Sequence, residues 1–485
     1  MILKPIVACT LAAAFFAAGS TAEAAEKLST AFGEIKLQGD LPAPGSIKTL
    51  YEELDLQQAT QAYLWALPIV STAQWQSEQA EKLGAKNGDL VVYQTFEDKL
   101  GILTPNATTP YVIGFVDLNQ TGPLVIDMPA GHAAGGVNDA WQREVASVGE
   151  SGPDRGEGAR YLLVPPGQQA PTEADGMRPI QATTMNVLIG FRALDPDPKQ
   201  AQALIEKFRL YPFSARANPP PTRVITPRDK RWYGGQPSGL AYWRRLHATL
   251  QTEPVAERDR FYMAMLASLG IEKGKPFQPD GRQKRMLERG AALGENMAKA
   301  MAFAKRAPDA KIWPDRGWKL VLEIEDPSQR VQNFDQLNER SAWFYEAVTN
   351  SKSMISKTPG VGQAYLGAYS DKAGQWLDGG KAYRLQVPAN APAKNFWSIT
   401  LYDTQTRSYV ENPAKAPDRS SRMPLAKNAD GSIDLYFGPK APTGKESNWV
   451  QTVPGRHWFA YFRLYGPTEP YFDRSWKIGD IELAR

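Results

Sequence analysis

The sequence predicts a mixed α+β fold, mainly β, in which two β-sandwich domains are bridged by a helical segment. A length of 485 residues exceeds what one compact core usually holds, so more than one domain is expected. The 40 glycines and 38 prolines exceed the usual share of about 12% for this pair, which favours short strands and many turns. Strand-like runs lie on both sides of a segment with helical periodicity. We expect a signal peptide at 1–24, an N-terminal β-rich domain at 48–195, a helical connecting region at 197–351 and a C-terminal β-sandwich domain at 381–485.

The first residues have the pattern of a secretory signal peptide. Lys4 supplies a positive charge, 6–18 is apolar, and Ala22-Glu23-Ala24 is a small-x-small cleavage site. The apolar run is shorter than the roughly 20 residues that cross a bilayer. The single cysteine, Cys9, lies inside this segment, so the expected mature chain has no disulfide and no thiolate nucleophile. We therefore expect a periplasmic or secreted protein, cleaved near Ala24, without a transmembrane segment.

The elements of the N-terminal domain follow from local pattern. Residues 26–46 are polar and punctuated by Pro and Gly, which predicts an extended arm. Apolar residues then recur at spacings of three and four from 55 to 86, which predicts an amphipathic helix that Pro68 should kink or break. Short β-branched or aromatic runs between turn residues predict strands at 90–95, 111–117, 124–128, 160–164 and 185–192.

The rest of the chain is helical and then strand-rich. Asp197-Pro198 is a good N-cap and first-turn pair for a helix. Helical periodicity predicts helices at 199–210, 240–251, 256–269, 282–305 and 329–349. Strand patterns return at 381–388, 395–403, 433–438 and 456–466.

Composition and motifs exclude several classes of protein. The 56 basic and 52 acidic residues nearly balance, which disfavours a nucleic-acid binder. The three histidines are far apart, and HExxH, paired CxxC, P-loop and nucleophile-elbow motifs are absent. Four carboxylates close together in sequence could in principle bind Ca²⁺ or Mg²⁺: Asp127, Asp139, Glu144 and Asp154. Their irregular spacing is more typical of exposed turns. We predict no cofactor and no tightly bound metal.

A first polar cluster runs from 104–111 to 138–143. Asp139 is a carboxylate flanked by Asn138 and Trp141, just after a predicted Gly135-Gly136 turn. It is a candidate general base or cation ligand. The alternative is that Asp139 and Asn138 cap a turn or helix, as these residue types often do.

A second cluster lies on the last predicted strand. Period-two alternation places Trp458, Ala460, Phe462 and Leu464 on one face. The other face carries His457, Phe459, Tyr461, Arg463 and Tyr465. Such a face could bind an anionic or sugar-like ligand by hydrogen bonds and stacking. The alternative is a solvated sheet face.

Many blocks, in order, resemble one family of exported bacterial proteins. In the N-terminal part they are 63–68 (YLWALP), 104–111 (TPNATTPY), 116–118 (VDL), 122–125 (GPLV), 135–142 (GGVNDAWQ), 152–154 (GPD) and 161–167 (YLLVPPG). In the C-terminal part they are 395–398 (NFWS), 401–403 (LYD), 430–432 (DGS), 435–439 (LYFGP), 447–449 (SNW) and 462–467 (FRLYGP). The family carries domain of unknown function 1254 followed by domain of unknown function 1214. The resemblance implies two β-rich domains, sandwich or jelly-roll in type, bridged by helices, and it implies no reaction.

The chain departs from the family pattern at one position. Many relatives carry Asn-x-Asp-Thr-x-Tyr where this chain has Asn106-Ala107-Thr108-Thr109-Pro110-Tyr111. Thr108 therefore replaces the family carboxylate, and only Asn106, Thr109 and Tyr111 match. No role of that carboxylate is carried over.

Two functions are compatible with these features. One is a hydrolase-like or lyase-like enzyme on a small or carbohydrate-like molecule, with Asp139 as base or cation ligand and Arg463 as anion clamp. Its substrate-binding residues would be Asn106, Thr109, Tyr111, Trp141, Asn448 and Tyr465. The alternative is a non-catalytic periplasmic ligand-binding or envelope-associated protein, favoured by Thr108 and by the scarcity of histidine. A small-molecule or glycan ligand and a homo-oligomer are both compatible with the sequence.

Overall fold

The computed structural model describes residues 28–172, 174 and 176–484, so the predicted signal peptide lies outside the described residues. The chain divides into two compact units, Met1–Asp55 and Leu56–Arg485. Helices account for 29% and strands for 26% of the structure, which confirms the mixed α+β class. The expectation of a mainly β fold is wrong, because long helices contribute as much as the sheets do.

The first unit contains two short hairpins and the beginning of a long helix. Strand β1 (Ser29–Thr30) pairs with β2 (Gly33–Glu34), and β3 (Leu37–Gln38) pairs with β4 (Leu41–Pro42). Helix α1 (Pro44–Leu83) follows at once. The amide of Lys36 donates to Ser46 Oγ at 2.8 Å and thereby ties the second hairpin to the start of the helix. The segment predicted as an extended arm is therefore folded locally.

Helix α1 continues through Pro68, so the predicted break does not occur. A proline lacks the amide that would bond the carbonyl four residues earlier. That carbonyl belongs to Leu64, and Ser341 Oγ lies 3.1 Å from it, sharing its one O–H with the Leu337 carbonyl at 2.6 Å. Ser341 comes from helix α8 (Leu337–Glu346), so a tertiary contact replaces the missing helical hydrogen bond.

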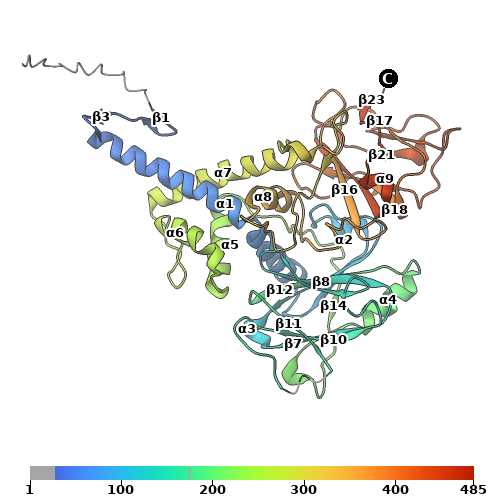
Figure 1. The fold of residues 1–485 in the computed structure, drawn as a ribbon, viewed down its shortest axis with the longest axis horizontal. Helices are drawn as coiled ribbons and strands as arrows, with labels where there is room; N and C mark the ends of the chain where they lie inside the picture. The colour runs from blue at the N-terminus through green and yellow to red at the C-terminus, as the bar shows by residue number, and fades with distance from the viewer. Residues whose placement is uncertain (1–27, 173, 175, 485) are drawn as a thin grey trace, which may run out of the picture. The chain divides into compact units, whose positions relative to one another are not determined.

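Two sheets form the N-terminal part of the second unit, the lower layers in Figure 1. Their strand orders are β14-β5-β6-β12-β8-β9 and β11-β10-β7-β13. The six-stranded sheet consists of β5 (Leu90–Tyr93), β6 (Tyr111–Asp117), β8 (Ala133–Asp139), β9 (Glu144–Gly149), β12 (Asn186–Ala193) and β14 (Val224–Ile225). The four-stranded sheet consists of β7 (Leu124–Met128), β10 (Ala159–Val164), β11 (Arg178–Gln181) and β13 (Arg209–Pro212). One core holds side chains of both sheets, including Val112 and Val137 from the first and Ile126 and Leu163 from the second.

Strand β8 corrects the expectation of a turn at Gly135-Gly136. Glycine weakens a strand, and the pattern therefore predicts a turn there. In the structure both glycines lie in the middle of β8, which pairs with β12 on one side and β9 on the other. Pairing along both edges supplies the order that the glycines themselves do not favour.

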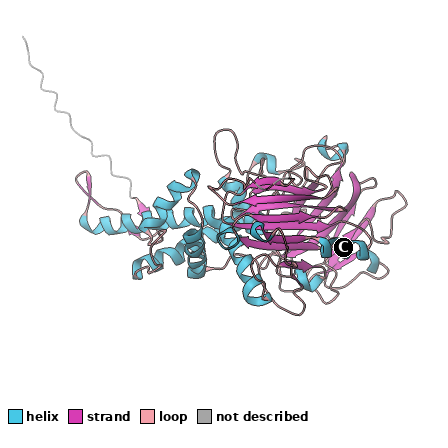
Figure 2. Cartoon of the chain, turned by 90° about the horizontal axis from the view of Figure 1, so that it is seen from below, coloured by secondary structure: helices cyan, strands magenta, loops and turns pink. Residues whose placement is uncertain are grey.

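The helices of the second unit pack closely on α1. Helices α5 (Gly239–Thr252), α6 (Arg260–Ser268) and α7 (Gly281–Phe303) group together beside the strands, as Figure 2 shows. A Cβ atom at Gly290 of α7 would lie 2.4 Å from Ala59 Cβ, so glycine is needed for this close approach. The shorter helices are α2 (Phe96–Lys99), α3 (Leu118–Thr121), α4 (Pro198–Lys207) and α9 (Glu469–Phe472). No helix in the described part of the chain has the length and apolar character needed to cross a membrane.

Two further sheets form the C-terminal part of the unit. Their strand orders are β15-β16-β22-β18-β19 and β21-β20-β17-β23. The five-stranded sheet consists of β15 (Lys319–Leu320), β16 (Gln363–Ala368), β18 (Ala393–Asp403), β19 (Asp418–Ser420) and β22 (Trp458–Pro467). The four-stranded sheet consists of β17 (Tyr383–Val387), β20 (Ile433–Gly438), β21 (Trp449–Gln451) and β23 (Glu482–Leu483). None of the described sheets closes or curls on itself, and their strand orders do not confirm a jelly-roll.

Candidate functional site

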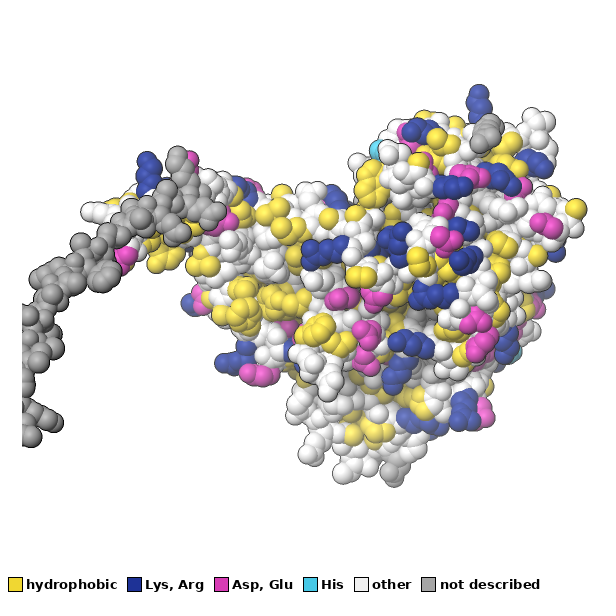
Figure 3. All heavy atoms as spheres, turned by 45° about the horizontal axis from the view of Figure 1, so that its top comes forward, with side chains coloured by type: hydrophobic (Ala, Val, Ile, Leu, Met, Phe, Trp, Pro, Cys, Tyr) yellow, Lys and Arg dark blue, Asp and Glu magenta, His cyan; other side chains and the backbone are white. Residues whose placement is uncertain are grey.

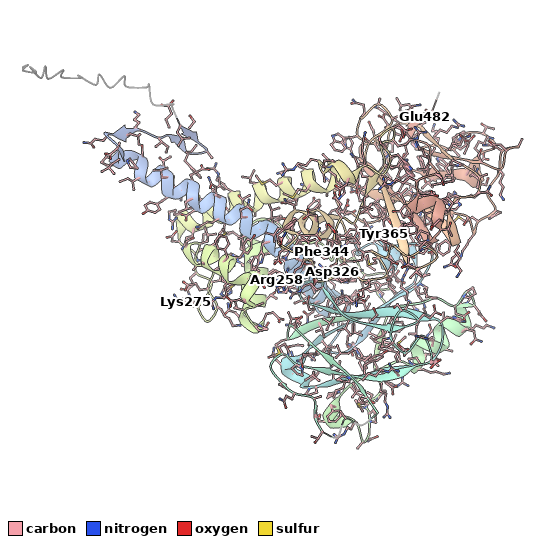
Figure 4. The ribbon with its side chains drawn as sticks, in the orientation of Figure 1. Arg258, Lys275, Asp326, Phe344, Tyr365 and Glu482 are labelled. Atoms are coloured by element: carbon pink, nitrogen blue, oxygen red, sulfur yellow. The ribbon has the colours of Figure 1, made fainter. Side chains whose placement is uncertain are left out.

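A cavity of about 170 Å³ lies where the six-stranded N-terminal sheet meets the five-stranded C-terminal sheet. Strands β6, β8 and β12 line one side of it. The loop 102–106, the segment 347–354 after α8, and strands β16 and β22 line the other sides. Tyr365 marks the contribution of β16 (Figure 4).

The cavity floor is a sheet face that lacks side chains at its centre. Gly190 of β12 lies in register with Gly136 of β8 and with Ile113 of β6. Arg192, two residues further along β12, pairs with Tyr111. Alternate residues of a strand share one face, so these side chains surround the two glycines. Both glycines line the cavity and add no side chain to this face.

Asn106 organises the loop that enters the cavity. Its Oδ1 accepts from the amides of Thr108 and Thr109, both at 3.0 Å, and from their hydroxyls, both at 3.1 Å. Its Nδ2 donates to the Tyr111 hydroxyl at 2.7 Å. The structure therefore brings together Asn106, Thr109 and Tyr111, and it gives Thr108 a bonding role at the position of the family carboxylate.

Lys99 supports this loop from behind and has no sequence signal. Its side chain is 1% exposed, and Nζ donates to the carbonyls of Asn106 at 3.2 Å and Thr109 at 2.9 Å. Burial lowers the pKa of Lys99 to about 8, because a charged amine loses its hydration there. A lysine in a short polar stretch normally faces solvent, which is why sequence reasoning missed it.

Arg463 of β22, in the five-stranded C-terminal sheet, bonds to the 102–106 loop of the N-terminal part. The guanidinium is buried and donates to Tyr402 Oη at 2.5 Å and to the Thr104 carbonyl at 2.7 Å. The Tyr402 hydroxyl in turn donates to the Pro105 carbonyl at 2.7 Å. A cation and a phenol of the C-terminal sheet therefore fix the N-terminal loop.

Two residues at this junction have strained backbones. Thr104 has φ 41° and Arg407 has φ 56°, the left-handed region that non-glycine residues rarely adopt. The Thr104 amide donates to the Arg407 carbonyl at 2.7 Å. Strain of this kind persists where surrounding contacts over-determine the backbone.

The alternation predicted for the last strand is confirmed. Trp458, Phe462 and Leu464 pack in the core between the two C-terminal sheets, whereas Phe459 and Tyr461 pack on the opposite face. The alternative of a solvated face is wrong, because every residue of β22 is buried. This strand lies inside its sheet and is covered on both faces. His457 lies just before the strand and is exposed.

Asp139 lies outside the cavity lining. Its Oδ1 accepts from the amides of Trp141 at 2.9 Å and Arg143 at 3.0 Å. Its Oδ2 accepts from Arg143 Nε and Thr183 Oγ1, both at 2.7 Å. These bonds occupy both carboxylate oxygens in the turn after β8, which favours the alternative that Asp139 organises a turn. Its neighbour Asn138 does line the cavity.

Three other predicted site residues lie elsewhere. The Asn448 side chain donates to the carbonyls of Ala426 and Asp434, so it fixes a loop. Trp141 packs against Trp65, with ring centroids 4.8 Å apart. Tyr465 stacks on Phe396 at 3.9 Å and is absent from the cavity lining.

The polar cavity residues that sequence reasoning missed include Arg192, Gln363 and Tyr365. The Gln363 amide satisfies its neighbours when its oxygen accepts from Arg192 and its nitrogen donates to Tyr365 Oη at 2.9 Å. Arg192 had a usable signal, since it is a cation at the end of an apolar strand and shares the face of Gly190. Among the described residues, no group of three or more His, Cys, Asp or Glu side chains could hold a metal.

Comparisons with known proteins match two regions of the chain. Residues 89–212 match the family described as "Protein of unknown function (DUF1254)", and residues 362–469 match "Protein of unknown function (DUF1214)". No curated protein matches the chain. The cavity therefore has walls from both regions and from the segment between them.

Two solved structures resemble the chain. The VPA0106 protein from Vibrio parahaemolyticus has a TM-score of 0.56 at 16% identity, and the alignment covers 89% of this chain and 100% of that chain. At this identity the likeness shows a shared fold alone. An uncharacterized protein from Burkholderia cenocepacia has a TM-score of 0.41 at 12% identity, covering 91% of this chain and 97% of that chain. By the family matches, the chain carries a DUF1254 region at 89–212 followed by a DUF1214 region at 362–469.

Proposed function

We propose that the protein binds a small molecule in the cavity between its DUF1254 and DUF1214 regions. The observation that carries this proposal is the hollow over Gly136 and Gly190, which both regions enclose. A volume of about 170 Å³ would hold on the order of ten waters, and hence a ligand with a similar number of heavy atoms. That size suits a metabolite or a single sugar rather than a polymer.

The lining has the mixed chemistry of a ligand site. Apolar and aromatic side chains form part of the wall, including Trp75, Ile102, Leu188, Trp343 and Met354. Polar groups form the rest, including Tyr111, Asn138, Arg192, Gln363, Tyr365 and Arg463. Small-molecule sites commonly combine an apolar wall with a few placed polar groups.

The phenols that line the cavity suit ligand binding better than base catalysis, because they keep their protons. Burial raises the pKa of Tyr111 and of Tyr365, against the opposing charges of Arg192 and Arg463. Both phenols therefore stay protonated at neutral pH and act as hydrogen-bond donors. The bonds made by Asp139 leave neither of its carboxylate oxygens free for a substrate proton.

A hydrolase-like or lyase-like enzyme on a small or carbohydrate-like molecule is the second candidate. The observation that favours it is the pair of protonated phenols beside two guanidiniums, because such a phenol can deliver a proton to a leaving group. Mass spectrometry of a bound compound after incubation separates the two functions. An unchanged compound supports the binding protein, and a converted compound supports the enzyme.

Filling part of the cavity with a methyl group at Gly190 tests the proposal directly. A Cβ at Gly190 would lie 2.8 Å from Ile113 Cδ1, the end of a side chain that can shift, so Gly190→Ala should fold with a smaller cavity. Gly281→Ala is the matched control, because a Cβ there meets only Arg285 Nη1 at 3.9 Å. In a thermal-shift screen against metabolites and sugars, hits should stabilise wild type and Gly281→Ala by about 2.7 kcal/mol at a hundredfold excess over Kd. Hits that stabilise Gly190→Ala equally would place the ligand elsewhere and contradict the proposal.

We also propose export and the domain division given by the sequence. The charged start, the apolar run and the small-x-small site support cleavage near Ala24 and a periplasmic or secreted location. The intact mass of protein recovered from the periplasm should equal that of a chain beginning at Ala25. A full-length mass would contradict cleavage. Limited proteolysis near 196 and near 352–380 would support domains at 48–195, 197–351 and 381–485.

A further inference from the structure

Four polar side chains of the cavity can donate to a ligand: Tyr111, Arg192, Tyr365 and Arg463. Tyr111 shows this by a count of its hydrogen bonds. Its hydroxyl oxygen accepts from the Asn106 amide at 2.9 Å and from Asn106 Nδ2 at 2.7 Å. A phenol oxygen offers two lone pairs and one O–H. Both lone pairs are used, so what Tyr111 can offer a ligand is its O–H. Tyr365 likewise accepts from Gln363 Nε2 at 2.9 Å and keeps its O–H.

Arg463 is a buried cation with unused donors. It is 3% exposed, and its bonds to Thr400, Tyr402 and Thr104 use three of its five N–H groups. In the described part of the chain no carboxylate forms an ion pair with it. Its other close neighbours are aromatic, with the Tyr461 ring centroid 5.2 Å away. A buried charge without a counter-ion is costly, and an anionic ligand would remove that cost.

Arg192 is half-buried and, in the part of the chain that the structure describes, also lacks a carboxylate partner. The side-chain partner that the structure gives it is the neutral amide of Gln363, and no ion pair to it is found among the described residues. Arg192 pairs with Tyr111 between β12 and β6, and Arg463 pairs with Tyr365 between β22 and β16, with its guanidinium carbon 5.6 Å from that ring centroid. Gln363 bonds to both Arg192 and Tyr365, so the four groups lie close together.

The nearby carboxylates are engaged or lie outside the cavity. Glu144 lines the cavity, but its oxygens accept from Ser147 Oγ at 2.5 Å and from the Lys352 amide at 2.8 Å. Asp418 acts on Lys99 and Arg463 from outside the lining, and burial raises its pKa to about 6. The guanidiniums of Arg192 and Arg463 and the O–H groups of Tyr111 and Tyr365 therefore remain available to a ligand. The lining also contains a buried acceptor, Asn350 Oδ1, that has no hydrogen bond to any described residue.

We infer that the ligand is a small organic carboxylate. Arg192, Arg463 and the O–H groups of Tyr111 and Tyr365 bind its carboxylate, and its organic body lies against the apolar wall. Guanidinium groups suit a planar carboxylate because they offer parallel N–H donors. This inference rests on the proposed function and assigns the chemical class of the ligand at that site.

A matched pair of probes tests the charge requirement. Ligand-observed fluorine NMR of the full-length protein compares para-fluorobenzoate with para-fluorobenzamide, which share size and shape but differ in charge. We expect the carboxylate to broaden and to be displaced by unlabelled benzoate, while the amide stays sharp at the same millimolar concentration. Equal binding of the amide would overturn the inference and leave the proposed function standing. Absence of binding by both would also overturn it, and the metabolite screen would then decide separately whether the cavity binds any ligand.

Variants locate the binding at the guanidiniums. Arg192→Gln, at a half-buried position, should weaken carboxylate binding about tenfold or more, since hydrogen bonds to charged groups are the strong ones. Arg178→Gln removes the same charge from an exposed position of β11 and should leave binding unchanged. Tyr111→Phe removes a donor without a charge change and should weaken the carboxylate by a smaller factor. Equal weakening by Arg178→Gln would mean that net charge alone attracts the probe, which would overturn the site assignment.

Discussion

At the scale of single residues, burial sets which charges the fold can tolerate. Glu346 has no solvent exposure, its Oε1 accepts from Tyr369 Oη at 2.9 Å, and its Oε2 has no partner among the described residues. Burial raises the pKa of Glu346 to about 7, because the charged form loses its hydration. Glu346 directly precedes Ala347, which lines the cavity, so it is a titratable group close to the site.

Glu346 should make stability fall as pH rises toward neutrality. Between about pH 4.5 and 7 the folded state holds a proton on Glu346 that the unfolded state has released. The stabilisation by protonated Glu346 is therefore complete below about pH 4.5 and is lost as the pH rises through about 7. Glu346→Gln cannot lose this proton, and at pH 8 it should be more stable than wild type by about 3 kcal/mol, at roughly 1.4 kcal/mol per pKa unit. Urea unfolding at pH 5 and pH 8 measures the difference. Equal effects of the substitution at both pH values would contradict the prediction.

At the scale of elements, the continuity of α1 depends on a partner outside the helix. Proline in a helix interior normally costs about 3 kcal/mol, through a lost hydrogen bond and a ring clash. Ser341 Oγ donates to the Leu64 carbonyl that Pro68 leaves free. Arg340, from the same turn of α8, donates to the next carbonyl, that of Trp65. Helix α8 therefore bonds to α1 at the turn where Pro68 leaves the Leu64 carbonyl without a helical donor.

A double-mutant cycle should reveal this compensation. Ser341→Ala in wild type should cost about 1–2 kcal/mol of unfolding free energy, because a buried carbonyl loses its donor. In a Pro68→Ala background, the restored amide should bond that carbonyl and reduce the cost to within about 0.5 kcal/mol. Denaturant titration of the four proteins gives the coupling. Equal costs in both backgrounds would show that Ser341 acts elsewhere, for example at its bond to the Leu337 carbonyl.

At the scale of the whole molecule, buried phenols hold the DUF1254 and DUF1214 regions together around the cavity. Tyr402 donates to the Pro105 carbonyl and Tyr409 donates to the Asn106 carbonyl at 2.8 Å. Exposed ion pairs also join the regions, including Lys415 to Glu97 at 2.5 Å. Basic and acidic side chains are intermingled over the face that Figure 3 shows. Buried hydrogen bonds should matter more than these pairs, since solvent screens the latter.

Removing the Tyr402 and Tyr409 hydroxyls should therefore destabilise the protein more than removing the Lys415–Glu97 ion pair. Tyr402→Phe with Tyr409→Phe should lower stability by about 2–4 kcal/mol, at 1–2 kcal/mol per lost buried bond, and should abolish stabilisation by cavity ligands. Lys415→Ala is the matched control, with an expected loss of about 0–1 kcal/mol and unchanged ligand stabilisation. Differential scanning calorimetry with and without ligand measures both quantities. Retained ligand stabilisation in the double variant would show that the loop does not depend on these phenols.

Local sequence pattern was enough to predict most of the helices, most strands of the two family regions and the regions themselves. Hydrophobic periodicity placed most strands of both regions, and the alternation along β22 correctly separated the two faces around Arg463. Asn106, Tyr111 and Arg463 were also chosen from residue type and motif, and all three line the cavity. Local pattern suffices for these features because they depend on side-chain chemistry and on the period of a strand.

Which residues come into contact depends on long-range pairing that local pattern does not encode. Gly136 and Gly190 form the hollow through the pairing of β8 with β12, although they are 54 positions apart in the chain. Arg192 lines the cavity and Lys99 supports the cavity loop from behind, because elements distant in sequence surround or bury them. Asp139 looked available in sequence, yet its oxygens bond to Trp141, Arg143 and Thr183. Non-local pairing and burial depend on the whole fold, so local pattern could not determine them.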